Sequence, residues 1–174
     1  VVDDHKAAFM ATEHLINNGY RRVAHISGPL HINIFKARFQ GYKDALKKHG
    51  IVYDPKLLFK GDVSISSGVR AIEKFLQLPN PPDAVFAVED FTALGAMQEL
   101  KRRHVLIPGE FGVIGFANER FGEYITPSLS TIDQQTVKMG EEAFTLLYKL
   151  IGNKGKKELA VQTTVLEPIP VYRE

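Results

Sequence analysis

Cysteine is absent from this 174-residue sequence, and neither sign of charge is in marked excess. Without cysteine the chain cannot form disulfides, thiolate nucleophiles or zinc–thiolate sites. The 22 Lys and Arg residues nearly balance the 20 Asp and Glu residues, so no overall positive field is available to hold nucleic acid or an anionic membrane. No apolar run approaches the roughly 18 residues that a membrane helix needs. What is present, 44% hydrophobic and 24% charged residues, indicates a soluble globular protein.

Short apolar runs alternate along the chain with amphipathic stretches. The runs are β-branched or aromatic and are bounded by Gly, Pro or Asp, which is typical of strands covered on both faces of a parallel sheet. They lie at 23–26, 84–88 and 113–116, with a weaker fourth run at 57–59. Patterns with a helical period occupy 7–17, 35–48, 69–76 and 94–101. This order predicts an α/β fold with a doubly wound, mostly parallel sheet flanked by helices.

The pattern changes after Phe116. We expect a loop with a short helix over 117–128, then an extended segment over 130–134. A strong helix is expected over 137–151, a polar, basic turn over 152–157, and a strand over 161–166 that Pro168 and Pro170 end. The apolar face of the expected helix consists of Val137, Gly140, Phe144, Leu147 and Ile151.

Open α/β sheets bind ligands beyond the carboxyl ends of their strands, so the polar residues there are the candidates for a site. Arg38 could bind ligand hydroxyls or a carboxylate, or it could be a solvated surface arginine. Glu89 and Asp90 could form a general acid–base pair, although a helix cap is the simpler interpretation. The six histidines lack metal-site spacing and no nucleophile motif is present. We therefore expect no catalytic residues, no metal and no cofactor.

The ordered series of segments is more specific than any one motif. His14–Ala24 resembles the HLIxxGHRRIA run of the lactose-repressor/galactose-repressor family of bacterial transcription regulators, and Pro82–Ala96 resembles its PTAVFAxNDxxALGA run. Further segments resemble the family at the family's spacing: 38–42, 61–68, 107–116 and 127–140.

The resemblance implies one lobe of a two-lobed, periplasmic-binding-protein-like type I fold, in which the effector lies between the lobes. Residues 1–134 would form the C-terminal lobe from the first crossing between lobes, 135–158 a helix of the N-terminal lobe, and 159–174 the returning strand and tail. The helix-turn-helix DNA-binding domain and most of the N-terminal lobe would be absent from this chain, whose start resembles a cut into a longer one.

Effector-contacting positions of the family can be carried over one at a time. Arg38 matches an arginine that typically holds effector hydroxyls or carboxylates, and Gln134 matches at the third crossing. Ala117 replaces the usual Asp that accepts sugar hydroxyls, and Glu89 replaces the usual Asn. The hypothesis is that Glu89 restores the lost acceptor. The remaining positions are Val63, where an aromatic ring often stacks on the ligand, and Ile32 and Ile34, where purine-binding members have polar residues.

The resemblance implies an effector-sensing domain of a cytoplasmic repressor, which controls operator binding allosterically through a sugar or sugar derivative. Its expected partners are the effector, operator DNA through the missing domain only, and a second copy of the chain, with no membrane. The expected homodimer surface comprises Leu94, Phe121, Tyr124 and Ile125. The alternative is a periplasmic sugar-binding protein of a transport system, which shares the fold.

Overall fold

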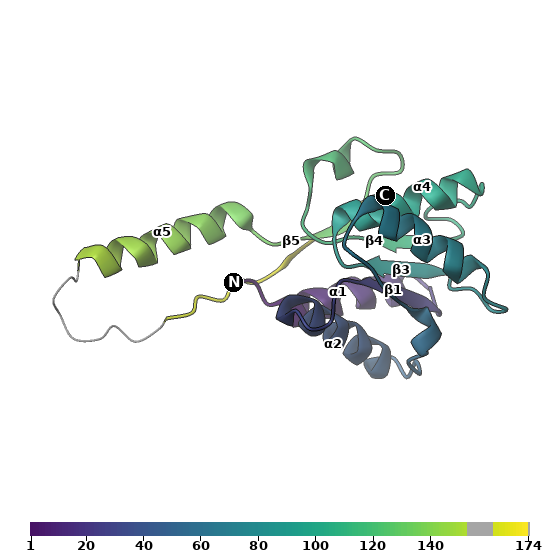
Figure 1. Ribbon diagram of the computed structural model, residues 1–174, viewed down its shortest axis with the longest axis horizontal. Helices are drawn as coiled ribbons and strands as arrows, with labels where there is room; N and C mark the ends of the chain where they lie inside the picture. Colours follow the sequence, from purple (N-terminus) through teal and green to yellow (C-terminus); the bar gives the residue numbers. More distant parts are fainter. Residues whose placement is uncertain (153–161, 174) are drawn as a thin grey trace.

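A four-stranded parallel sheet lies at the centre of the fold in the computed structural model, which describes residues 1–152 and 162–173 (Figure 1). Its neighbouring strands all pair in parallel, in the order β2-β1-β3-β4. The strands are β1 (Val23–Ser27), β2 (Leu58–Lys60), β3 (Ala84–Ala87) and β4 (Gly112–Ile114). The predicted doubly wound α/β fold is therefore confirmed.

Two pairs of helices cover the two faces of this sheet. Along each strand, alternate side chains point to opposite faces, so Val23 packs with α1 and α2 whereas Ala24 packs with α3 and α4. A short 3₁₀ helix, η1 (Pro55–Leu57), precedes β2. The four covering helices are α1 (Asp4–Asn17), α2 (Asn33–Lys48), α3 (Ile65–Leu76) and α4 (Asp90–Arg102).

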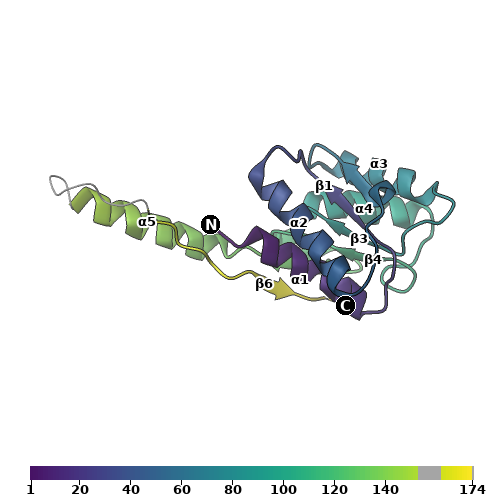
Figure 2. The ribbon, with the colours of Figure 1, turned by 90° about the horizontal axis from the view of Figure 1, so that it is seen from below.

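After β4 the chain packs against the core through Leu129 and Ile132, then leaves the compact body and returns to it. The 3₁₀ helix η2 (Arg120–Glu123) confirms the expected short helix, and β5 (Thr131–Asp133) pairs antiparallel with β6 (Ile169–Val171). Between β5 and β6 the chain forms α5 (Thr136–Gly152), which projects away from the sheet in both views (Figures 1 and 2). None of the α5 residues is buried.

The strand expected over 161–166 is wrong in its described part. Residues 162–165 form no strand, and Leu166 makes only an isolated bridge to Val2. Residue 161 and the expected basic turn beyond Gly152 lie outside the described residues. The strand instead forms at 169–171 and includes Pro170, where the sequence predicts the end of a strand. Proline is compatible with this position because β6 pairs on one side only and needs no N–H on the other.

His25 in β1 is a fully buried titratable side chain on the α1–α2 face. It is 0% exposed and stacks against the rings of Tyr42 and Phe86. Its Nδ1 donates to the Phe86 carbonyl oxygen at 2.9 Å, whereas Nε2 has no hydrogen-bond partner among the described residues. Burial lowers the pKa of His25 to about 4.

We expect acid to destabilise the fold through His25. Its folded-state pKa of about 4 lies below the 6.5 of an ordinary histidine, so its contribution is complete above about pH 6.5 and decreases as the pH falls toward 4. The expected loss is about 1.4 kcal/mol per pH unit, or roughly 2 kcal/mol between about pH 6.5 and pH 5. Urea unfolding at both pH values should show this loss in the wild type and in the exposed-histidine control His31→Gln, but not in His25→Phe. Equal pH dependence in all three proteins would contradict the assignment.

Candidate functional site

Arg38 of α2 is a buried arginine at the carboxyl end of the sheet. It is 5% exposed, so its interpretation as a solvated surface residue is wrong. Its Nε and Nη2 lie 2.8 and 2.7 Å from Oδ1 of Asp4, and Nη1 donates to the Val88 carbonyl oxygen at 2.7 Å. The guanidinium carbon lies 3.5 Å from the centre of the Phe116 ring. Elements that are far apart in sequence thus hold one charged group.

The close packing of α1 against α2 brings Asp4 to Arg38. A Cβ at Gly41 would overlap the carbonyl group of His5, so glycine at this position permits the approach of the two helices. Asp4 lies in the first turn of α1, which begins at the Asp3 cap. Burial lowers the pKa of Arg38, and the charge of Asp4 opposes this effect. Sequence reasoning missed Asp4 as a site residue because no pattern links it to a partner 34 positions away.

Glu89 and Asp90 have separate roles at the start of α4. Glu89 is the N-cap: its Oε1 accepts from the Thr92 amide at 2.7 Å and its Oε2 accepts from the Phe91 amide at 3.1 Å. The cap interpretation is confirmed. Asp90 is buried and accepts hydrogen bonds from other elements, and burial raises its pKa. The two carboxylates therefore do not face a common reacting atom as an acid–base pair would.

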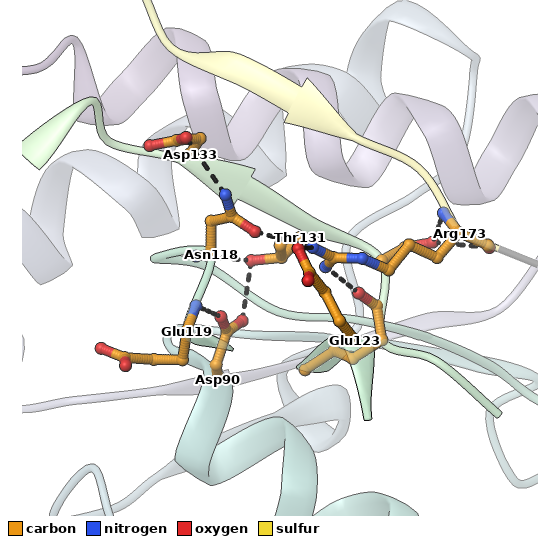
Figure 3. Close-up of polar contacts among 9 residues, drawn as sticks. Asp90, Asn118, Glu119, Glu123, Thr131, Asp133 and Arg173 are labelled. Carbon is orange, nitrogen blue, oxygen red and sulfur yellow. Dashed lines mark hydrogen bonds and ion pairs between the residues drawn. The ribbon is translucent and has the colours of Figure 1, made fainter. Parts of the chain in front are cut away.

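The loop that follows β4 has an unusual backbone, which Asp90 and β5 hold in place (Figure 3). Ala117 and Asn118 have φ values of 128° and 57°, in the region that favours glycine. The Glu119 amide donates to Asp90 Oδ2 at 2.7 Å, and the Thr131 hydroxyl donates to Asp90 Oδ1 at 2.7 Å. Sequence reasoning places Ala117 and Asn118 among the candidates beyond the strand ends but missed Thr131, because it stands in no motif for this geometry.

The structure brings Arg38 and Glu89 together. Arg38 donates to the carbonyl of the residue before Glu89, and the charge of Glu89 acts on the Arg38 guanidinium. Gln134 is half-buried directly after β5, whose Asp133 Oδ2 accepts from the side-chain Nδ2 of Asn118 at 3.1 Å. The other predicted residues lie after β1 and β2: Ile32 (39% exposed), Ile34 (43% exposed) and the half-buried Val63. Their contact with a ligand remains a prediction.

The residues of the predicted dimer surface lie on α4 and around η2. Phe121 packs against Phe91 with ring centres 4.9 Å apart, and Phe121 and Ile125 are partly buried against the core. Tyr124 is 77% exposed. Leu94 is half-buried on α4. Self-association through these residues also remains a prediction.

Within residues 1–152 and 162–173, no group of three or more His, Asp and Glu side chains is arranged to hold a metal ion. Nor does this part contain a helix of the length and apolar character needed to cross a membrane.

The parallel sheet with helices on both faces, and with the candidate residues beyond one end of its strands, has the architecture of a periplasmic-binding-protein-like domain. Residues 12–174 match the family described as "Periplasmic binding protein-like domain". The chain belongs to this family and, within it, to the lactose-repressor/galactose-repressor group of transcription regulators.

Similar proteins support this assignment in sequence and in structure. The repressor CytR of Escherichia coli K12 is 38% identical over 146 residues, which cover 84% of this chain and 43% of CytR. A putative LacI regulator from Bacillus cereus subsp. cytotoxis superposes with a TM-score of 0.92 at 28% identity, covering 99% of this chain and 60% of that one. The regulator CelR, in complex with cellobiose, has a TM-score of 0.89 at 32% identity, with 99% and 52% covered. The chain thus spans less than half the length of CytR.

Removing Asp4 should destabilise the fold because it leaves a buried guanidinium without its counterion. We expect Asp4→Ala to lower the free energy of unfolding by about 3–5 kcal/mol, and the double variant Asp4→Ala/Arg38→Met to lower it by less. Urea unfolding of the single and double variants measures this difference. Lys6→Ala, which breaks the exposed pair with Glu167, is the control and should change little. Additive effects at positions 4 and 38 would show that the two side chains are not coupled.

Proposed function

We propose that the chain senses a small-molecule effector, a sugar or sugar derivative, as part of a bacterial transcription repressor. The arrangement of Arg38 and Asp4 carries this proposal. Nη1 and Nη2 of Arg38 each keep a second N–H, and Asp4 keeps Oδ2, beyond the contacts within the described residues. Adjacent hydroxyls on a sugar can accept from such a guanidinium and donate to such a carboxylate.

Two replacements favour a sugar derivative over a plain sugar. Ala117 provides no carboxylate, so one acceptor for ligand hydroxyls is missing from the loop after β4. Glu89 offers carboxylate oxygens at the end of β3, and each oxygen can accept a further hydrogen bond beside those of the helix cap. Cellobiose, the sugar in the complex of CelR, is a reasonable first ligand to test.

We propose that residues 1–134 form the C-terminal lobe, that 135–158 belong to the N-terminal lobe, and that 159–174 return to the C-terminal lobe. The exposure of α5 supports this division, because a helix with so many apolar side chains requires a covering surface. Its exposed large apolar residues are Val137, Phe144, Leu147, Tyr148, Leu150 and Ile151. The second lobe would provide that surface and the opposite wall of the effector cleft.

In this proposal, effector binding changes how the two lobes close, and closure changes the spacing of paired DNA-binding domains on the operator. The protein acts in the cytoplasm, catalyses no reaction and contacts DNA only through the domain outside this chain. The similarity to a repressor such as CytR does not favour the alternative of a periplasmic transport protein.

Effector recognition is tested by calorimetric titration of the full-length protein with cellobiose, glucose, ribose and glucosamine. Arg38→Lys keeps the charge but loses the forked donor, and should weaken binding of the sugar that binds by about 10- to 100-fold. Arg120→Lys, an exposed arginine of η2, is the matched control and should bind normally. Binding of no sugar by the wild type would reject the proposed effector class. Equal dissociation constants in the folded Arg38→Lys variant and wild type would reject the role of Arg38.

The proposed dimer surface is tested by sedimentation at protein concentrations of about 1–100 μM. Tyr124→Arg introduces a charge into the surface and should raise the dimer dissociation constant by about tenfold or more. Val52→Arg changes a side chain that is 89% exposed on the opposite edge of the fold, and should leave the constant unchanged. A monomeric wild type, or equal effects of the two variants, would contradict this surface.

A further inference from the structure

The side chain of Arg173, in the tail after β6, lies among several loops (Figure 3). It is only 12% exposed. Nη1 donates to the Leu129 carbonyl oxygen at 2.6 Å, and Nη2 donates to Asn118 Oδ1 at 2.8 Å and to Glu123 Oε1 at 3.2 Å. The Arg173 amide donates to the Ser130 hydroxyl oxygen at 2.9 Å, and that hydroxyl lies 3.0 Å from the Arg173 carbonyl oxygen. Both the backbone and the side chain of this residue are thus anchored.

The backbone of Asn118 is left-handed and follows a strained residue. A φ of 57° is open to asparagine at modest cost, whereas the φ of 128° at Ala117 is unfavourable for any residue but glycine. Three contacts hold Asn118 in this conformation. Arg173 donates to Asn118 Oδ1, Asn118 Nδ2 donates to Asp133, and the Asn118 amide donates to Thr131 Oγ1 at 3.2 Å. Without Arg173, the Asn118 side chain would lose its only charged donor among the described residues.

The residues that Arg173 contacts lead to two different surfaces. Asn118 directly follows Ala117, and its hydrogen bond to Asp133 joins it to the segment that contains Gln134. It therefore belongs to the ligand edge, by which we mean the carboxyl ends of the sheet strands with the predicted ligand-binding residues. Glu123 belongs to η2, next to the exposed Tyr124 of the predicted dimer surface. One guanidinium therefore connects the ligand edge with the η2 surface.

We propose that Arg173 is a positioning residue that keeps the strained loop after β4 and η2 in one arrangement, and so couples the ligand edge of the sheet to the η2 surface. Its functional consequence rests on the function proposed above, because that function assigns a ligand to one surface and a second subunit to the other. The structural part, the joint immobilisation of the loop and η2, stands independently of it.

Site-resolved amide hydrogen exchange of the full-length protein tests the structural part. In Arg173→Gln, we expect the amides of Asn118, Glu119 and Gly122 to exchange about tenfold or more faster than in the wild type. The amides of Gly61 and Val88, which donate to strand carbonyls elsewhere in the sheet, should keep their rates. Arg173→Lys keeps the charge without the fork, and should still give fast exchange at Asn118.

The matched control is Arg120→Gln, which removes an exposed arginine from η2, the 3₁₀ helix that Arg173 contacts through Glu123. This variant should leave all these rates unchanged. Uniform acceleration at every amide in Arg173→Gln would show a general loss of stability and would overturn the proposal. Rates equal to those of Arg120→Gln would overturn it as well.

Sedimentation tests the coupling to function. If Tyr124→Arg raises the dimer dissociation constant above that of the wild type, Arg173→Gln should also raise it, by a few-fold or more, although it changes no residue of the dimer surface. A dissociation constant of Arg173→Gln equal to that of the wild type would then refute the coupling. Where Tyr124→Arg has no effect, the proposed dimer surface is wrong, and hydrogen exchange alone decides the role of Arg173.

Discussion

A charged side chain that water barely reaches needs partners on several sides. The guanidinium of Arg38, at the carboxyl end of the sheet, has three such partners: Asp4, the carbonyl of Val88 and the ring of Phe116. The relative positions of α1, α2, β3 and the segment after β4 are consequently linked through one group. Because the protein itself holds the guanidinium, its remaining donors are already oriented before a ligand arrives, which reduces the ordering cost of binding.

The helices before and after Asp133 differ in how well their apolar side chains are buried. Up to that residue, the helices and strands bury a continuous core on both faces of the sheet. Beyond it, α5 has apolar side chains on much of its circumference, and none is buried. Its sequence is thus suited to an interior, whereas the body of the lobe is complete without it. This contrast is the physical basis for the proposal that α5 belongs to a second lobe.

Most of the fold could be predicted because local rules determine it. Apolar runs mark the buried strands, helical periodicity marks the covering helices, and a cap at Glu89 or Asp90 is recognisable because the pair precedes an amphipathic stretch. Contacts between distant residues carry no such mark. The pairing of Arg38 with Asp4 and the insertion of Arg173 beside Asn118 depend on how completed helices and loops pack. Local rules also misplaced the last strand, because Pro170 disfavours a central strand but not an edge strand.

The turn that contains Val52 provides a site for protein engineering. Helix α2 begins at the ligand edge and ends at Lys48, so the turn after it lies at the opposite edge of the sheet. The side chain of Val52 is 89% exposed and therefore contributes little to the core. Exposed turns of this kind accept inserted domains most readily. A fluorescent reporter placed there would be attached to the helix that holds Arg38, at the end farthest from that arginine, and would leave the anchored C-terminal tail unmodified.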